Sequence, residues 1–160
     1  DAIGQTVKIR QFVAPLDIGL AAEKVASTGN TKILLTERGT SFGYNNLVVD
    51  MRGLAIMRGF GWPVIFDATH SVQLPGGLGS ASGGQAEFIE PLARAAAAVG
   101  IDGLFVEVHE APERAFSDGP NALRLDRLAG FLTRVRAIDT LVKGDEFGLH
   151  AGAAAGVNYR

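Results

Sequence analysis

Four short runs of apolar and β-branched residues recur along the chain, and a glycine- or proline-bearing loop and then a helical pattern follow each one. Two of them, Ile33-Leu34-Leu35 and Val64-Ile65-Phe66, are apolar without interruption, as in parallel strands covered on both faces. Starts at positions 32, 63 and 103 suit βαβ units, which need about 30 residues or more. The predicted strands are residues 5–8 with an extension to Phe12, 32–37, 63–68 and 103–108.

The segments between these strands carry helix signals at their ends. Capping residues or a proline precede the helices, and glycines follow two of them. The predicted helices are residues 18–27 (cap Asp17, stop Gly29), 47–58 (cap Asn46), 92–99 (opened by Pro91, ended by Gly100) and a short helix over 112–116.

The clearest amphipathic pattern covers residues 126–142. Apolar side chains at spacings of three and four share one face of a helix, and here they are Leu128, Phe131, Leu132, Val135, Ile138 and Val142. The segment from Gly144 to Arg160 is rich in Gly and Ala and weakly patterned, so we expect a loosely ordered tail.

Four βα units predict an α/β fold but do not close a barrel, since an eight-unit barrel takes about 250 residues. We therefore expect half of a TIM (β/α)8 barrel, with four parallel βα units, or a small open α/β sheet. Either leaves two open strand edges for a partner to cover. The domain prediction is one unit over residues 1–143, followed by the tail over 144–160.

The composition is that of a globular protein, with 47% apolar and 20% charged residues, which excludes a disordered chain or a disulfide scaffold. The net charge of -2 argues against general nucleic-acid binding, and no apolar run approaches the roughly 20 residues of a membrane span. The absence of cysteine fits the cytoplasm. The start at Asp1, with neither Met nor a signal peptide, indicates a processed start or a piece of a longer chain.

Polar residues gather where the four predicted strands end. In a parallel α/β fold these ends meet on the face that carries active sites. We therefore expect the side chains to lie together at this face, which we call the mouth of the site. They are Lys8, Arg10 and Gln11; Glu37 and Arg38; Asp67 and His70; and Glu107 and His109, with Asp118 soon after.

Arg38 is the leading candidate for binding an anion. A guanidinium matches phosphate or carboxylate in a bidentate manner, and Gly39 lets backbone N–H groups approach. Lys8 adds a second cation at the same mouth. The alternatives are a structural pair between Arg38 and Glu37, and a solvated loop lysine at position 8.

His70, Glu107 and Asp118 form a candidate metal site of one nitrogen and two carboxylates, a set that suits iron, manganese or zinc. They come from different loops, so no local spacing confirms them. The alternative is that His70 is hydrogen-bonded to Asp67 as a structural feature of the strand end. His109 faces the mouth or caps the short helix, and His150 has no assigned role.

Glycine is frequent, at 21 of 160 residues, and it dominates the stretch from Pro75 to Gly84. A lid over a phosphorylated substrate is one interpretation, and a disordered surface loop is the other. The stretch is not a P-loop, because no Lys-Ser/Thr follows at the required place.

Five longer motifs resemble the family of 3-deoxy-D-manno-octulosonate 8-phosphate synthases. The resemblance covers roughly residues 7–143, and motifs of this length are jointly specific. They are ERGTSFGYNNLVVDMR (37–52), FDATHSVQLPGG (66–77), SGGQ (82–85), GLFVEVH (103–109) and SDGPN (117–121).

The resemblance implies a TIM-barrel enzyme, usually a homotetramer, that condenses phosphoenolpyruvate with arabinose 5-phosphate and water on the route to lipopolysaccharide. It implies that Lys8 and Arg38 hold phosphoenolpyruvate, that the glycine-rich loop closes over the pentose phosphate, and that a divalent metal (Mn, Fe, Zn, Co or Cd) is bound, or that the same polar set serves a metal-free form. The implied residues are Lys8, Arg38, Gln73 and Asn45 for substrate, and His70, Glu107 and Asp118 for catalysis and metal.

The chain also departs from that family. A Lys-Lys pair before Gln-Phe is here Lys8-Ile9-Arg10, and Glu110 and Arg124 stand where prolines are usual. The first four βα units of the family are absent, and with them the region for the pentose phosphate and the Cys or Asn that separates metal-dependent from metal-free members. The site of this chain is therefore expected to be incomplete.

Two other functions remain open from the sequence. One is 3-deoxy-D-arabino-heptulosonate 7-phosphate synthase, which shares the Glu-Arg-Gly and Ser-Asp-Gly-Pro patterns but normally has Asp-Pro-Ser-His where this chain has Asp67-Ala68-Thr69-His70. The other is a non-catalytic half-barrel that binds anions or assembles with another chain, which the open strand edges favour.

Overall fold

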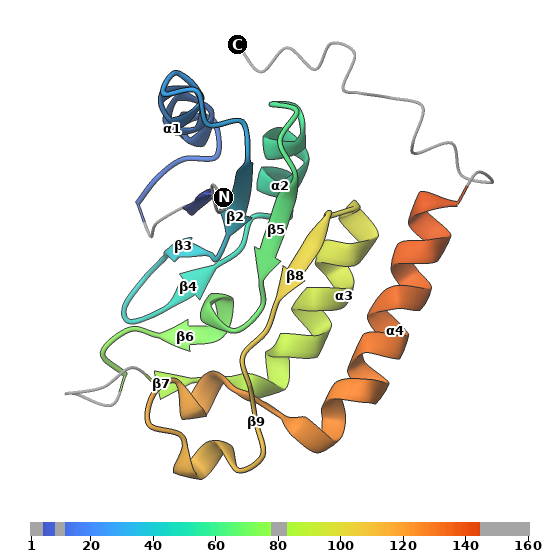
Figure 1. Cartoon of the computed structure of the whole chain (residues 1–160). Helices are drawn as coiled ribbons and strands as arrows, with labels where there is room; N and C mark the ends of the chain where they lie inside the picture. Colours follow the sequence, from blue (N-terminus) through green and yellow to red (C-terminus); the bar gives the residue numbers. More distant parts are fainter. Residues whose placement is uncertain (1–4, 9–11, 78–82, 145–160) are drawn as a thin grey trace.

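A computed structural model describes residues 5–8, 12–77 and 83–144 of the chain. Four parallel strands form one sheet in chain order, namely β1 (Gln5–Lys8), β2 (Ile33–Glu37), β5 (Val64–Asp67) and β8 (Gly103–Phe105) (Figure 1). The register places Lys8 opposite Thr36 and Asp67 opposite Phe105. Each strand is followed by a helix, so the predicted α/β fold with parallel strands is confirmed.

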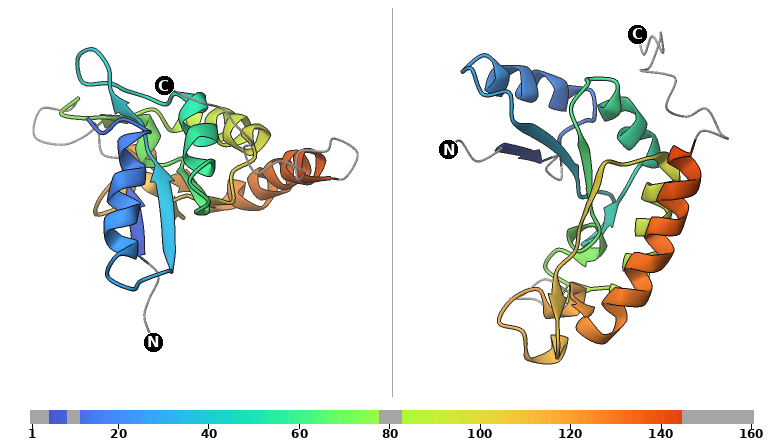
Figure 2. Two further views of the ribbon diagram at one scale, coloured as in Figure 1. Left: turned by 90° about the horizontal axis from the view of Figure 1, so that it is seen from above. Right: turned by 45° about the vertical axis from the view of Figure 1, so that its right-hand side comes forward.

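The four helices are α1 (Asp17–Ala26), α2 (Met51–Arg58), α3 (Ile89–Val99) and α4 (Leu125–Lys143). Helix α2 contacts α3, and α3 contacts α4, so the last two helices run side by side beyond β8 (Figure 2). None of the helices within the described ranges is long and apolar enough to cross a membrane.

Three of the predicted helix starts were wrong. Asp17 is the first residue of α1 rather than its cap, and Asn46 caps nothing because residues 47–48 form β4 (Leu47–Val48). Helix α2 is capped by Asp50, whose side chain accepts a hydrogen bond from the Arg52 N–H. Helix α3 starts at Ile89, two residues before Pro91.

The predicted helix stop at Gly100 is confirmed. Gly100 has a φ of 95°, a left-handed conformation that glycine adopts without steric cost. The helix predicted over 126–142 is α4, one residue longer at each end. The short helix predicted over 112–116 is a 3-10 turn, η3 (Pro112–Arg114).

Three pairs of very short strands lie in the connections that follow β2, β5 and β8 of the central sheet. An antiparallel pair joins β3 (Thr40–Ser41) to β4, and another joins β6 (Gln73–Leu74) to β7 (Gly83–Gly84). A parallel pair joins β9 (Val108–His109) to β10 (Leu123–Arg124). The run predicted as one strand over 103–108 is therefore divided between β8 and β9, and Glu107 lies in the gap.

The core lies between the sheet and the helices. Leu35 and Phe66 of the sheet and Leu54 of α2 are fully buried. The residues that alternate with the buried strand positions, Leu34 and Ile65, are only half-buried. The uninterrupted apolar runs predicted strands covered on both faces, but in the described residues the face that carries Leu34 and Ile65 remains partly open.

The apolar face of helix α4 is also only partly covered by neighbouring elements. Phe131 is completely buried, whereas Leu132, on the predicted apolar face, keeps 49% of its surface exposed. An open groove of about 410 Å³ lies beside it, lined by Ile101, Leu104 and Val135 among others. Apolar side chains on this side of α4 therefore have fewer neighbours than the sequence pattern predicts.

Candidate functional site

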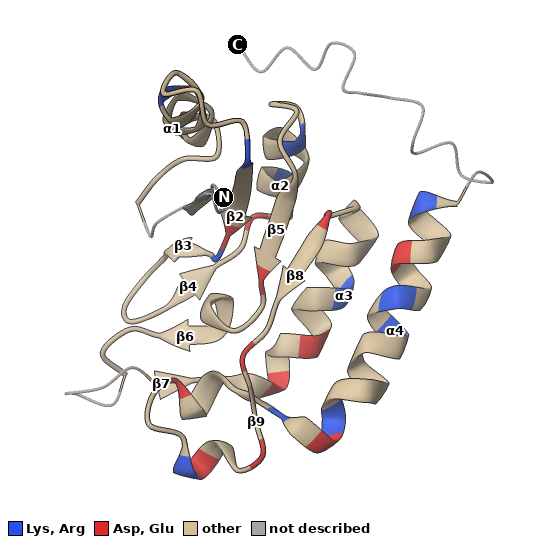
Figure 3. Cartoon of the chain, in the orientation of Figure 1, with Lys and Arg blue, Asp and Glu red and all other residues tan. Residues whose placement is uncertain are grey.

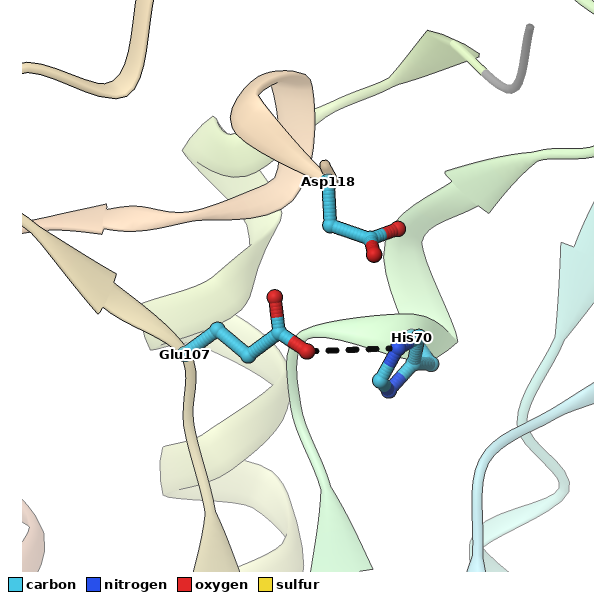
Figure 4. A group of neighbouring side chains, drawn as sticks. All are labelled: His70, Glu107 and Asp118. Atoms are coloured by element: carbon cyan, nitrogen blue, oxygen red, sulfur yellow. Dashed lines mark ion pairs between the residues drawn. The ribbon is translucent and has the colours of Figure 1, made fainter. Parts of the chain in front are cut away.

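Three polar side chains converge where β5 and β8 end. His70 begins the 3-10 turn η1 (His70–Val72) just after β5, Glu107 follows β8, and Asp118 precedes the 3-10 turn η4 (Gly119–Asn121). One nitrogen or oxygen from each lies within 4.8 Å of the others, and Figure 4 shows all three pointing into one space. The structure thus brings together the three residues that the sequence singled out as a metal site.

Asp67 fixes the orientation of His70. Its Oδ2 lies 2.8 Å from Nδ1 of His70, and its Oδ1 accepts a hydrogen bond from the His70 backbone N–H at 3.0 Å. Asp67 is fully buried. Nε2 of His70 faces the other way and lies 3.5 Å from Oε1 of Glu107, so this second ring nitrogen points into the shared space.

The hydrogen bond to Asp67 raises the pKa of His70 above its ordinary value. Burial and the charge of Arg38 oppose this shift, while the charges of Asp67 and Glu107 reinforce it. The imidazole ring also stacks on Phe105, with the ring centroids 5.8 Å apart. The hydrogen bond between Asp67 and His70, which the structural alternative predicted, is therefore present. Because it involves Nδ1, it does not prevent a metal from binding at Nε2.

Thr69 positions Glu107. Its hydroxyl accepts a hydrogen bond from the Glu107 backbone N–H at 2.7 Å, and Thr69 is fully buried. The segment Asp67-Ala68-Thr69-His70 therefore orients both His70 and Glu107. Thr69 had no predicted role, although its place between two candidate residues in one motif was an available signal.

Asp118 has an unusual backbone conformation. Its φ is 51°, in the left-handed region that non-glycine residues rarely occupy and that clusters at functional sites. Its Oδ1 accepts a hydrogen bond from Nε2 of Gln73 at 2.7 Å. Gly119 is needed next to it, because a Cβ there would overlap with the carbonyl oxygen of Pro112.

Arg38 lies beside this cluster and is linked to it by the same glutamine. Its Nη2 donates a hydrogen bond to Oε1 of Gln73 at 2.7 Å, while its Nε is buried and has no partner among the described residues. A buried guanidinium nitrogen without an acceptor calls for an explanation. An anion bound at Arg38 would supply the missing acceptor.

The pairing of Arg38 with Glu37 that the sequence left open is not observed in the described residues. Glu37 is buried and accepts a hydrogen bond from the backbone N–H of Gly39 instead. Burial raises the pKa of Glu37, and backbone hydrogen bonds from Gly39 and Arg38 lower it in part. Among the described residues, Arg38 therefore pairs with Gln73 and not with Glu37.

The donor set fits a divalent metal ion. An imidazole nitrogen with two carboxylates suits iron, manganese, zinc or cobalt and leaves coordination positions open. The carboxylate-histidine pair formed by Asp67 and His70 is the usual partner arrangement of a metal-binding histidine. Figure 3 shows acidic positions at the end of β5 and between β8 and β9, as well as on α3 and α4.

Lys8 and Asn45 are the other residues that were predicted to bind substrate. The backbone of Lys8 lies at the end of β1, opposite Thr36, and Arg10 and Gln11 fall outside the described residues. Asn45 lies in the exposed turn between β3 and β4 with a φ of 49°. No described contact joins it to the triad, so its substrate role stays a prediction.

The other two histidines of the chain are His109 and His150. Nδ1 of His109 accepts a hydrogen bond from the Ala111 backbone N–H at 2.9 Å, in the turn before η3, which itself has no side-chain cap. His150 and all of the expected tail (144–160) except Gly144 lie outside the described residues. The glycine-rich stretch 75–84 begins directly after β6 and ends with β7, which pairs with β6, and its residues 78–82 are not described.

Comparisons with known proteins agree with the motifs. Residues 5–144 match the model of the DAHP synthetase I family. A relative from Syntrophotalea carbinolica named 2-dehydro-3-deoxyphosphooctonate aldolase, a synonym of the octulosonate 8-phosphate synthase, is 62% identical over 89% of this chain and 52% of its own length. A Geobacter sulfurreducens protein of the same name is 62% identical over 86% of this chain and 50% of its own length.

The chain thus spans about half the length of the curated relatives that it matches. The resemblance to the octulosonate synthases, predicted from the motifs, is confirmed by the names and identities of these relatives. The chain belongs to the DAHP synthetase I family.

Proposed function

We propose that this chain is the C-terminal half of a 3-deoxy-D-manno-octulosonate 8-phosphate synthase. The enzyme would condense phosphoenolpyruvate with D-arabinose 5-phosphate and water to give the octulosonate 8-phosphate and inorganic phosphate. The observation that carries the proposal is the joining of Arg38, Gln73 and the triad at the ends of parallel strands. Relatives about 60% identical bear the name of this activity.

The half-barrel architecture is part of the proposal. The family forms TIM barrels, and the four parallel strands stand in chain order as in one half of such a barrel. Residues 1–143 would supply four βα units, with residues 144–160 outside the barrel. The groove beside Leu132 and Val135 would receive apolar elements of the other half.

Arg38 would bind phosphoenolpyruvate. The substrate carries a phosphate and a carboxylate, both of which a guanidinium can bind through paired hydrogen bonds. The buried Nε of Arg38 has no partner among the described side chains, and Lys8, at the end of β1, would bring a second cation to the same mouth.

His70, Glu107 and Asp118 would hold the divalent ion in metal-dependent members. When bound, the ion would orient water or polarise the aldehyde of the sugar, making its carbon more electrophilic. The chain's own residues set the geometry. Asp67 keeps Nε2 of His70 directed at the site, and Thr69 fixes the backbone of Glu107. Carbon–carbon bond formation then needs both substrates in near-attack geometry.

The heptulosonate synthase alternative is not favoured. The relatives at about 60% identity carry the octulosonate name, and Ala68 and Thr69 stand where the heptulosonate pattern has Pro and Ser. A homotetrameric state and a cytoplasmic location remain part of the proposal, on the strength of the family resemblance and the lack of cysteine.

A fusion enzyme tests the proposal directly. The N-terminal half of the Syntrophotalea carbinolica relative is joined to residue 5 of this chain, and consumption of phosphoenolpyruvate is measured with arabinose 5-phosphate and with erythrose 4-phosphate. Turnover with the pentose phosphate is expected. The Arg38→Ala variant should raise the KM for phosphoenolpyruvate by more than about tenfold.

Two outcomes would contradict the proposal. Turnover with erythrose 4-phosphate alone would favour the heptulosonate synthase. A folded fusion without turnover toward either sugar would favour the non-catalytic half-barrel that binds anions or another chain.

A further inference from the structure

Gln73 connects the two halves of the site. Its Oε1 accepts a hydrogen bond from Nη2 of Arg38 at 2.7 Å, and its Nε2 donates one to Oδ1 of Asp118 at 2.7 Å. These residues lie 35 and 45 positions away along the chain. One side chain thus bridges the candidate anion-binding cation and a candidate metal ligand.

The chemistry of the partners allows only one orientation of the Gln73 amide. A guanidinium is a donor without acceptor capacity, and an ionised carboxylate is an acceptor without a donor. The amide oxygen must therefore face Arg38, and the NH2 group must face Asp118. Both ends of the amide are thus engaged by protein groups, although its oxygen has a second lone pair and its NH2 group a second N–H.

The β6–β7 hairpin holds Gln73 in this position. Gln73 pairs with Gly84 across the hairpin, and Gly84 lies against Asn121 of η4 so closely that a Cβ at position 84 would overlap with the Asn121 amide oxygen. Asn121 is fully buried. The hairpin is thereby packed against the loop that carries Asp118, both through the backbone and through the Gln73 side chain.

We propose that Gln73 is a positioning residue that holds Asp118 for the metal and Arg38 for phosphoenolpyruvate. The hydrogen bond to Oδ1 fixes the rotamer of Asp118 and leaves Oδ2 for an ion. Removal of a residue that hydrogen-bonds to a metal ligand typically lowers metal affinity by about 10- to 100-fold. This inference rests on the proposed function, because it takes the triad to be a metal site.

Cobalt(II) binding to the 160-residue chain tests the metal part of this role. Bound Co²⁺ gives a visible absorption spectrum that reports its ligands and geometry. Gln73→Met keeps the length of the side chain but removes both hydrogen bonds, and it should weaken Co²⁺ binding by about 10- to 100-fold and change the spectrum. Asp118→Ala serves as the reference for loss of the ligand itself.

Gln85→Met is the matched control. Gln85 lines the same small cavity as Gln73, immediately after the hairpin, and receives the same chemical change. Its Co²⁺ affinity should stay within about twofold of the parent chain. Urea denaturation of all variants separates a loss of metal affinity from a loss of folded protein.

The Arg38 part of the role is measured in the fusion enzyme. Gln73→Met should raise the KM for phosphoenolpyruvate, and Gln85→Met should not. Equal Co²⁺ affinity and equal KM in Gln73→Met and the parent, with binding lost in Asp118→Ala, would overturn the positioning role and leave the proposed function intact.

Absence of saturable Co²⁺ binding by the folded parent chain would also overturn the proposal. Conversely, the expected Co²⁺ result together with a fusion that turns over neither sugar would support the role of Gln73 at the metal and contradict the proposed activity. The failure of one hypothesis is therefore distinguishable from the failure of the other.

Discussion

Nδ1 of His70 lies 2.8 Å from Oδ2 of Asp67, a carboxylate that is fully buried at the end of β5. An ionised carboxylate accepts hydrogen bonds and donates none. The pair therefore favours the tautomer with the proton on Nδ1, which leaves the lone pair of Nε2 directed toward Glu107 and Asp118. The same contact that could be purely structural also prepares His70 to bind a metal.

Replacement of Asp67 by Asn should weaken metal binding without removing any ligand. In the parent chain each carboxylate oxygen accepts one of the two hydrogen bonds, whereas an amide has only one oxygen and places an NH2 donor at the other position. If its oxygen keeps the backbone N–H, its NH2 group faces Nδ1 and drives the ring proton to Nε2. We expect Co²⁺ affinity to fall about 10- to 100-fold, measured by titration of the chain.

Asp102→Asn is the control for Asp67→Asn. Asp102 accepts a hydrogen bond from the Val64 backbone N–H, and an Asn oxygen can still accept it. The control should bind Co²⁺ as the parent does. Equal affinity in Asp67→Asn and Asp102→Asn would show that Asp67 does not set the tautomer of His70.

Metal binding should depend on pH through His70. The hydrogen bond to Asp67 raises the pKa of His70 above 6.5, and a protonated imidazole has no lone pair for a metal. Co²⁺ affinity should therefore fall as the pH drops through this raised value, with a midpoint above 6.5. A midpoint below 6.5 in the parent chain would contradict the raised pKa.

In the metal-free chain, the contribution of His70 to the free energy of unfolding should increase as the pH falls, whereas the Co²⁺ affinity decreases. A raised pKa in the folded state stabilises the protein fully below the unfolded value of 6.5, and this contribution is lost as the pH rises through the folded value. The difference in free energy of unfolding between the parent and His70→Gln should thus be larger near about pH 5.5 than near about pH 8.5. A difference that grows with pH would exclude this linkage.

Strand ends and residue types made the triad predictable before its geometry was known. Parallel strands bring their carboxyl ends to one edge, so His70, Glu107 and Asp118 could be grouped although they are distant in sequence. The hydrogen bonds of Gln73 and Thr69 were not predictable in this way. They depend on side-chain directions in short turns, which periodicity does not encode.

The errors in the fold have a similar origin. Long periodic segments such as α4 were predicted to within one residue at each end. The spacing of their apolar residues shows which face of the helix packs against the core. Asn46 was taken for a helix cap because it precedes an apolar run, but that run starts with β4, and Asp50 caps α2. Local capping signals do not tell a short hairpin strand from the first turn of a helix.

Gly84→Ala should destabilise the site by steric conflict. The new Cβ would overlap with the Asn121 amide oxygen, and overpacking of this kind costs about 1–3 kcal/mol. Asn121→Ala in the same chain should recover much of this loss, since it removes the obstructing group. The coupling free energy from the four urea denaturation curves should be about 0.5–3 kcal/mol, and a value near zero would contradict the close approach.

Gly100→Ala should lower stability, whereas Gly130→Ala should raise it. Gly100 ends α3 with a φ of 95°, and the left-handed conformation costs an L-residue about 1–2 kcal/mol. Gly130 lies exposed within α4, where Ala is preferred over Gly by about 1 kcal/mol. The pair is compared by the free energy of unfolding, and effects of the same sign would contradict the assigned end of α3.

Phe131 should contribute more to folding than any neighbour on α4. It is completely buried, while the adjacent Leu132 keeps 49% of its surface exposed. Truncation of a buried Phe costs about 3–5 kcal/mol, so Phe131→Ala should unfold much of the 160-residue chain, whereas Leu132→Ala should cost below about 1 kcal/mol. In the fusion enzyme the cost of Leu132→Ala should rise, because the other half of the barrel would cover the groove beside it. An equal cost in the chain and in the fusion would contradict this placement of the missing half.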